Sequence, residues 1–188
     1  MDEAVLRRLV KEVRATIGRV YGKKGKHFLR KRIEGYNLAA SFQPWVVLVD
    51  LDRDQECAPP FRSLWLPQPT SKMCFRVAVR AAESWLLADR ERLATFLAIP
   101  PSRIPRDPEA ELDPKRTMVD LAAGSRRREI RANMTPRPGS GRSVGPAYTS
   151  RLIEFILYQE TGWRPDVAAR SSESLRRCLE CLRRLATS

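Results

Sequence analysis

Three carboxylates follow the most hydrophobic run of the sequence at alternating positions. Residues 45–54, WVVLVDLDRD, place Asp50, Asp52 and Asp54 directly after the aliphatic run VVLV. In an extended chain, residues i and i+2 point the same way and lie about 6.5 to 7 Å apart, so two such carboxylates can share or flank a hard cation. Magnesium prefers sites with one or two carboxylates and otherwise water or substrate phosphate. The pattern therefore predicts that Asp50, Asp52 and Asp54 bind Mg2+ or Mn2+ for phosphoryl chemistry.

Other patterns with acids at these positions explain the sequence less well. An EF-hand loop also has Asp at its first, third and fifth positions, but its sixth residue is Gly and its twelfth is Glu, where this chain has Gln55 and Phe61. A haloacid-dehalogenase-type phosphatase continues its D-x-D to Thr or Val rather than to Asp54, and it is kept as a minor alternative. Acids that simply open a turn after a strand are the plainest alternative, since Asp is frequent in turns.

The hydrophobic periodicity predicts the elements that would position these acids. WVVLVD is apolar on both alternations, which is typical of a strand buried on both faces of a parallel sheet. We expect helices over residues 2 to about 20, 26–40 and 81–97, a short helix that starts at Pro59 and Pro60, and a second strand at MCFRVAV. This order favours an α/β fold with a small, mostly parallel sheet flanked by helices. Ligands of such sheets bind outside the carboxyl ends of the strands, where Asp50 and Asp52 fall.

The second half of the chain reads as a connector and a helical C-terminal part. Residues 100–146 contain a proline-rich connector, a helix around 115–123 and an arginine-rich segment that ends in a Pro, Gly and Ser loop. Residues 147–188 contain two amphipathic helices, and Leu175, Cys178, Leu179 and Leu182 share one face of the second. We expect the thiols to be core residues rather than zinc ligands. The whole chain, 1–188, is predicted to be a single domain with its α/β core in residues 1–99.

The net charge indicates a polyanionic partner. The chain has 35 Lys and Arg against 22 Asp and Glu, a formal net charge of +13, and a field of that sign attracts nucleic acid. A genome-wide preference for arginine is the alternative. No apolar run approaches the ~20 residues of a membrane span and the N-terminus does not resemble a signal peptide, so we expect a cytoplasmic protein. The residues predicted to contact nucleic acid are Lys23, Lys24, Lys26, Arg30, Arg76, Arg80, Arg126, Arg127 and Arg128.

The acids are part of a longer resemblance. The segments VVLVDLDRD, FRVAVRAAESWLLADRERLATFL, DPKRTMVDLA, VGPAYTSRLIEFI and SSESLRRCLECL together look like a small stand-alone family of bacterial Toprim-like proteins related to OLD-type nucleases. Toprim is the catalytic module of topoisomerases, primases and OLD-type nucleases, in which a strand ending in D-x-D lies beside a strand ending in Glu. The resemblance covers nearly the whole chain, and only its D-x-D is chemically specific. It implies a Toprim-like, Rossmannoid sheet.

The resemblance also implies a function. It points to a Mg2+-dependent nuclease or a related phosphodiester-processing enzyme, in which Asp50 and Asp52 match the metal-binding pair. Glu83, in RAAESWLLAD, matches the family's acidic position after the next strand and would orient a metal or water. The alternative for Glu83 is a helix-surface acid paired with Arg76 or Arg80. Some relatives occur in phage-defence loci, and such domains often work with an ATPase, which would be a separate chain here.

The N-terminus departs from the Toprim pattern. Toprim catalysis normally uses a glutamate at the end of the first strand, in a junction similar to E-G-x-x-D-E. This chain starts at Met1, Asp2 and Glu3, as if it entered the junction just after the glycine, so we expect the first strand and its glutamate to be missing. A start codon assigned too far downstream and a real truncation both fit. The rival hypothesis is therefore a catalytically idle basic protein that binds nucleic acid or a partner ATPase.

Overall fold

The sheet of this protein is small and parallel. The computed structural model describes residues 1–21, 25–52 and 54–187, and within them two strands, β1 (Trp45–Asp50) and β2 (Met73–Ala78), pair in parallel. The register sets Trp45 opposite Met73 and Asp50 opposite Ala78. The predicted α/β class is confirmed, with the parallel sheet flanked by helices. The helices are α1 (Asp2–Glu12), α2 (Lys26–Ala39), α3 (Ala58–Trp65), α4 (Ala82–Leu87), α5 (Arg90–Leu97), η1 (Pro101–Arg103), α6 (Pro114–Ala123), α7 (Arg128–Met134), α8 (Tyr148–Leu157), α9 (Pro165–Ala168) and α10 (Glu173–Ala186).

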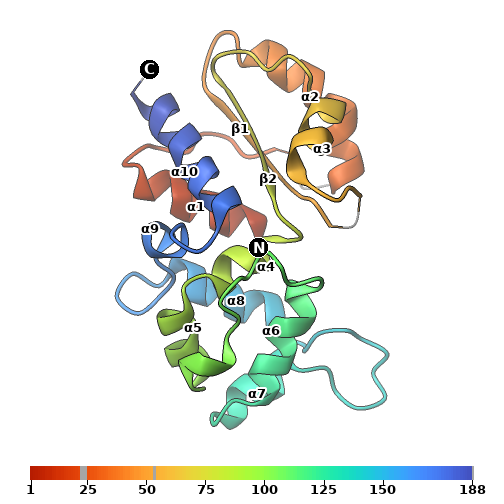
Figure 1. The fold of residues 1–188 in the computed structure, drawn as a ribbon, viewed down its shortest axis with the longest axis vertical. Helices are drawn as coiled ribbons and strands as arrows, with labels where there is room; N and C mark the ends of the chain where they lie inside the picture. The colour runs from red at the N-terminus through yellow and green to blue at the C-terminus, as the bar shows by residue number, and fades with distance from the viewer. Residues whose placement is uncertain (22–24, 53, 188) are drawn as a thin grey trace.

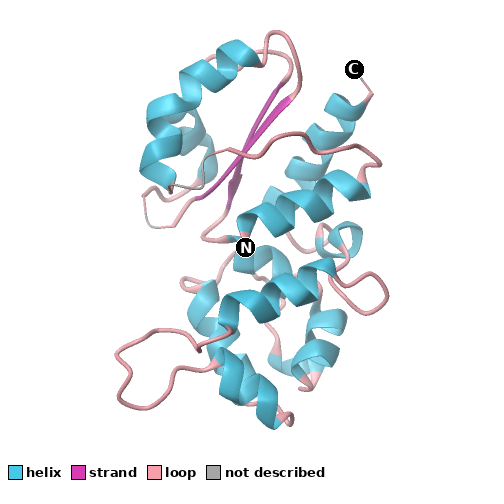
Figure 2. Cartoon of the chain, turned by 180° about the vertical axis from the view of Figure 1, so that it is seen from behind, coloured by secondary structure: helices cyan, strands magenta, loops and turns pink. Residues whose placement is uncertain are grey.

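Helices cover both faces of the sheet, as the apolar strand pattern predicted. Alternate side chains of a strand point to opposite faces, and Val47 and Phe75 pack with Ile33 of α2 in one cluster of buried residues. Leu48 and Cys74 belong to a second, larger cluster that also contains residues of α1, α4 to α8 and α10. Figure 1 shows the strands between α2 and α3 on one side and α1 and α10 on the other. Figure 2 shows the larger helical part of the molecule beyond the end of the sheet.

The first helix is shorter than predicted. The hydrophobic spacing predicted a helix to about residue 20, but α1 ends at Glu12. Arg14 adopts a left-handed backbone with φ 57°, its N–H donates to the carbonyl of Lys11, and the N–H of Ala15 donates to the carbonyl of Val10. This pair of hydrogen bonds is the Schellman ending of a helix, which usually has glycine at the left-handed position. Because arginine occupies it, the sequence lacked the usual stop signal.

The helix predicted over residues 81–97 is two helices, α4 and α5, separated at Asp89. The Asp89 side chain is fully buried and accepts the Arg92 N–H at the start of α5, at 3.5 Å. It also receives the backbone N–H of Arg164 at 2.9 Å and two guanidinium contacts from the same residue at 3.1 and 2.7 Å. A buried carboxylate needs such compensation, so the ion pair fixes the break between the two helices.

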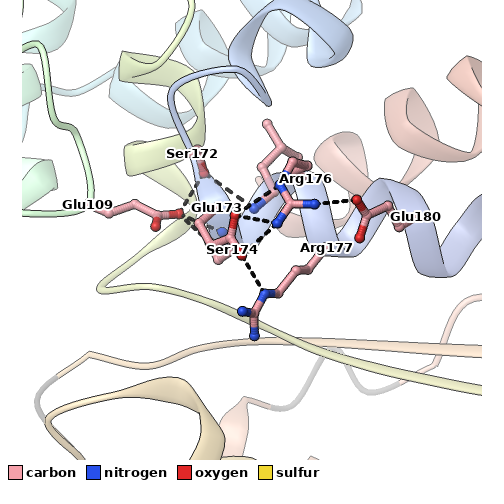
Figure 3. A network of polar contacts seen from close by, with 8 residues as sticks. Glu109, Ser172, Glu173, Ser174, Arg176, Arg177 and Glu180 are labelled. Atoms are coloured by element: carbon pink, nitrogen blue, oxygen red, sulfur yellow. Dashed lines mark hydrogen bonds and ion pairs between the residues drawn. The ribbon is translucent and has the colours of Figure 1, made fainter.

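A network of hydrogen bonds attaches the N-terminus of α10 to the end of the sheet. Ser172 caps α10 by accepting the Leu175 N–H at 3.3 Å, and the Glu109 carboxylate accepts both the Ser172 and Ser174 hydroxyls at 2.6 Å (Figure 3). The Ser174 oxygen in turn accepts the indole N–H of Trp85 in α4, at 2.7 Å. α10 is therefore tied to α4, the helix that follows β2.

Charged pairs along α10 contribute less to this attachment. Glu173 accepts hydrogen bonds from Arg176 and Arg177, and Arg176 also pairs with Glu180 (Figure 3). All four side chains are about half exposed, with relative accessibilities from 48% to 56%, and exposed ion pairs add little to stability. The buried serines at the start of α10 are the stronger restraint.

The C-terminal helix has the buried face that its sequence predicted. Leu175, Cys178, Leu179 and Leu182 are all buried, and Cys178 is a free thiol in the core. The helix expected around residues 115–123 is α6. None of the helices in the described part of the chain combines the length and the apolar character that crossing a membrane requires.

The buried Asp89–Arg164 pair gives a stability prediction. Asp89→Ala should lower the free energy of unfolding by about 3 to 5 kcal/mol, because it removes the buried carboxylate that accepts three contacts from Arg164 and the Arg92 N–H. The control is Glu91→Ala, which removes another carboxylate that contacts Arg164, but one that is 81% exposed; it should cost less than about 1 kcal/mol. Urea unfolding followed by tryptophan fluorescence measures both, and equal losses would contradict the assignment.

Candidate active site

Backbone hydrogen bonds hold the carboxyl ends of β1 and β2 together beyond the last strand pair. The Leu51 N–H donates to the Ala78 carbonyl at 2.9 Å, and the Asp52 N–H donates to the Arg80 carbonyl at 2.7 Å. Asp52 and Arg80 both adopt left-handed backbones, with φ 53° and 63°, which for residues with a Cβ costs about 1 to 2 kcal/mol each. The extended geometry predicted for residues 50–52 is therefore wrong, because the strand ends at Asp50. Strand alternation does not place Asp52 beside Asp50.

Asp50 is the most enclosed of the three acids in the D-x-D-x-D sequence. Its Oδ1 accepts the backbone N–H of Ala82, at the start of α4, at 3.0 Å. Burial and, to a smaller extent, the negative charges of Asp2, Glu83 and Asp52 raise the pKa of Asp50 to about 7, although the Ala82 hydrogen bond acts in the opposite direction. The carboxylate thus lies among other acids, and a cation bound beside it would be stabilised.

Glu83 is buried, so the alternative of a helix-surface acid is wrong. Only 1% of the residue is exposed, and its Oε1 accepts the Tyr148 hydroxyl of α8 at 3.2 Å. Burial raises the pKa of Glu83, and the charge of Lys115 and the Tyr148 hydrogen bond partly counteract it. The hydrogen-bond partner of Glu83 is Tyr148 rather than Arg76 or Arg80. The resemblance predicted an acid after the second strand, and Glu83 lies there, in α4.

Asp52 and Asp54 share a lysine. The Lys26 ammonium, at the start of α2, lies 2.6 Å from Asp52 Oδ2 and 2.9 Å from Asp54 Oδ2. Burial alone would lower the pKa of Lys26, but its hydrogen bonds to the two aspartates raise it above the usual value. Lys26 was predicted to contact nucleic acid, and here its charge is balanced by the acids. Any cation that uses Asp52 must compete with this ammonium group.

The predicted basic residues do not form one surface. Arg30 is exposed on α2, near one end of the molecule. The other end contains α7 (Figure 1), and at the start of α7 lie the exposed Arg126, Arg127 and Arg128. Arg80 is close to the acids, because its carbonyl bonds to Asp52. Arg76 lies in β2 and interacts with the thiols of Cys74 and Cys181. Lys23 and Lys24 lie outside the described residues.

Two residues of this site were not predicted from the sequence. Asp2 contributes the largest charge effect on Asp50, but its sequence position only indicated the start of a helix. Tyr148 donates to Glu83, and its pKa is raised above the usual value by burial and by that carboxylate. The one available signal was a tyrosine on the apolar face of α8, where a buried hydroxyl needs a hydrogen-bond partner.

The donor set suits a hard cation only in part. Within the described residues, no group of three or more His, Cys, Asp and Glu side chains is arranged to hold a metal ion. Mg2+ is usually bound through only one or two carboxylates, with water and substrate phosphate as the other ligands. Asp50 and Asp52 supply two such carboxylates, of which Asp52 is already paired with Lys26, and Glu83 lies within electrostatic range of Asp50.

Comparison with known proteins gives no further guide to this site. No family model, no curated protein and no solved structure matches the chain. The candidate function therefore has to follow from the residues and from their geometry.

The raised pKa of Asp50 predicts how stability depends on pH. The native carboxyl group has a pKa of about 7 and the unfolded one about 3.9, so between these values the native state binds more protons and stability falls as pH rises. In metal-free buffer, the difference in free energy of unfolding between Asp50→Asn and wild type should increase in favour of the variant by on the order of 2 to 4 kcal/mol as pH rises from 4 to 8. Asparagine keeps an oxygen for the Ala82 N–H.

The matched control is Asp120→Asn, an exposed aspartate of α6, which should follow the wild-type pH dependence. Urea unfolding at several pH values measures all three proteins. A constant difference between Asp50→Asn and wild type across this range would contradict the proposed burial of charge.

The Tyr148–Glu83 contact gives a second prediction for the site. Tyr148→Phe removes the hydroxyl that donates to a buried carboxylate, so it should destabilise the protein by about 1 to 3 kcal/mol at pH 8. The pKa of Glu83 should rise further, and the loss should shrink as pH falls and the carboxyl group becomes protonated. Tyr158→Phe is the control, because Tyr158 is 56% exposed. Thermal unfolding at pH 5 and pH 8 tests both variants, and a pH-independent loss would argue against the contact.

Proposed function

We propose that this chain is a Toprim-like, Mg2+- or Mn2+-dependent enzyme that cleaves phosphodiester bonds in nucleic acid. The observation that carries the proposal is Asp50, a half-buried carboxylate at the carboxyl end of a parallel strand, with a pKa raised to about 7 by burial and neighbouring acids. Ligand sites of open α/β sheets lie at this edge. The D-x-D sequence that ends β1 supports the same function through its resemblance to Toprim domains.

The residues around Asp50 have separate roles in this proposal. Asp50 and Asp52 hold the cation, and Tyr148 keeps the buried Glu83 in a fixed orientation toward the site. A bound Mg2+ supplies charge to polarise a phosphate oxygen and to lower the pKa of a water molecule. Arg80 offers a buried Nε that has no acceptor among the described residues, next to the acids, and a phosphate oxygen is a fitting acceptor.

The positive charge of the chain supports binding of a polyanion. A net charge of +13 attracts nucleic acid from a distance, and the exposed arginines of α2 and of the segment before α7 lie far enough apart to contact separate stretches of backbone (Figure 1). Contacts of this kind weaken steeply with salt. They position a substrate, while the acids at the end of the sheet perform the chemistry.

The enzyme proposal predicts metal-dependent cleavage. The full chain should cleave labelled single- or double-stranded DNA or RNA with Mg2+ or Mn2+, and EDTA should abolish the reaction. Asp50→Ala should reduce cleavage to background, because it removes the best-enclosed cation ligand, whereas the exposed Asp120→Ala should keep wild-type activity. Gel electrophoresis of the products measures this. Absence of cleavage of both nucleic acids with either metal would refute the enzyme.

A second candidate, a catalytically idle nucleic-acid- or partner-ATPase-binding protein, is favoured by one observation. Lys26 pairs with Asp52 and Asp54 and so offsets one of their two negative charges without a metal. This candidate predicts nucleic-acid binding that depends on salt but is unaffected by EDTA or by Asp50→Ala. Calorimetric titration of Mg2+ into wild type and Asp52→Asn separates the two, since only the enzyme should bind the metal and lose affinity in the variant.

A further inference from the structure

A second polar site lies beside β2. A pocket of about 380 Å3 opens between α3, the end of α10 and the loop that precedes β2. It differs from the acidic site in its chemistry, because no Asp or Glu is among the residues of the described chain that line it. The polar residues that line it are Arg62 of α3, Thr70 and Ser71 of the loop, Arg76 of β2, and Cys181 and Arg184 of α10.

Two of these arginines have buried donors without acceptors. The Nε atoms of Arg62 and Arg76 are enclosed, and within the described chain neither finds a hydrogen-bond partner. Buried N–H groups are nearly always paired in folded proteins, because an unpaired one destabilises the fold. Both arginines line the pocket, so an anion bound there would offset the charge of guanidinium groups whose Nε lacks an acceptor.

The charges in the pocket favour an anion. Burial lowers the pKa of Arg62, and the positive charge of Arg76 lowers it further, so the two guanidinium groups repel each other. The Cys181 thiol accepts a hydrogen bond from Cys74, and this contact together with the charge of Arg76 lowers its pKa below the usual value. Arg184 also donates to the Cys181 sulfur, at 3.5 Å. The arginines therefore favour the thiolate form of Cys181.

We propose that this pocket binds a phosphate monoester. Arg62 and Arg76 each have a buried Nε without an acceptor among the described residues, and no carboxylate of the described chain lines the pocket, so an anion with several oxygens suits it. A phosphate monoester carries a charge of about −1.5 to −2 at pH 7 and three strong acceptor oxygens. Arginine forks bind such oxygens in pairs, and the hydroxyls of Thr70 and Ser71 can donate as well. The group belongs either to a free nucleotide or to the end of a nucleic-acid strand.

This site does not depend on the proposed nuclease activity. The lining residues exclude Asp50, Asp52 and Glu83, so binding should be the same in EDTA and in Mg2+. The two proposals can therefore be refuted independently. Absence of cleavage would not refute phosphate binding in this pocket, and absence of phosphate binding would not refute the metal site.

Calorimetric titrations in EDTA identify the ligand. Inorganic phosphate and adenosine 5′-monophosphate should both bind the full chain, and a short 5′-phosphorylated oligonucleotide should bind more tightly than its 5′-hydroxyl counterpart. If the 5′-phosphorylated oligonucleotide binds with at least about tenfold higher affinity than the free nucleotide, the natural ligand is the end of a strand. Similar affinities of the two indicate a free nucleotide. If neither phosphate nor the nucleotide binds, the proposal is overturned.

Substitutions then locate the site. Arg62→Gln and Arg76→Gln should each weaken phosphate binding by at least about tenfold, the usual scale for a charge-assisted hydrogen bond. Arg184→Gln has a matched control in Arg183→Gln, which removes the same charge from the same last turn of α10 but does not line the pocket. Only Arg184→Gln should weaken binding. Equal effects of these two, or wild-type affinity in the Arg62 variant, would refute the pocket as the binding site.

The rate of Cys181 alkylation tests the proposal without any arginine substitution, so it applies even if the arginine variants do not fold. In a Cys57→Ser background, which removes the exposed thiol, mass spectrometry reports the rate at which iodoacetamide alkylates Cys181 at pH 7. Bound phosphate should slow this reaction at least about tenfold at saturation, because it covers the sulfur and raises its pKa. Chloride at the same ionic strength is the control. An unchanged rate at saturating phosphate would overturn the proposal.

Discussion

The hydrogen bond from the Ala82 N–H to the Asp50 carboxylate is the constraint on which the candidate active site depends. It closes the turn between β2 and α4 onto the end of β1, in addition to the two backbone hydrogen bonds that already join the strand ends. The same closure encloses Asp50 and brings the next residue of α4, Glu83, into its electrostatic range. One backbone N–H offsets only part of this effect, so the pKa of Asp50 stays near 7. The acidic cluster is thus a consequence of how the turn is built.

The elements of this fold were predictable where local pattern decides them. The run WVVLVD predicted β1 because it is apolar on both alternations, the sequence MCFRVAV predicted β2, and the prolines before Phe61 predicted α3. The end of α1 was not predictable, because Arg14 adopts a conformation that glycine usually takes. The break at Asp89 depends on Arg164, 75 residues further along the chain. Helix propensity alone cannot reveal a partner at that distance.

In the candidate site, too, some features were predictable from the sequence and others were not. The acids of the D-x-D and Glu83 could be named from the sequence, since their positions relative to predicted strands are local properties. Their environment could not, because the partner of Glu83 is Tyr148, which is 65 residues away, and Lys26 reaches Asp52 from another helix. The arginine pocket beside β2 shows the same limit, since Arg62, Arg76 and Arg184 come from three separate elements. Convergence of like charges is a tertiary property.

Two sites of opposite sign border one short sheet, and each contains a group with a shifted pKa. Asp50 is shifted upward among acids, and Cys181 is shifted downward beside arginines, so each site favours a bound ion of the sign that it lacks. Proteins usually compensate buried charge with internal partners, as this chain does at Asp89 and Arg164. Uncompensated charge in a concave or enclosed place destabilises the free protein and is a common property of binding sites. The contrast between that pair and these two clusters of like charge is the reason for proposing a function at each cluster.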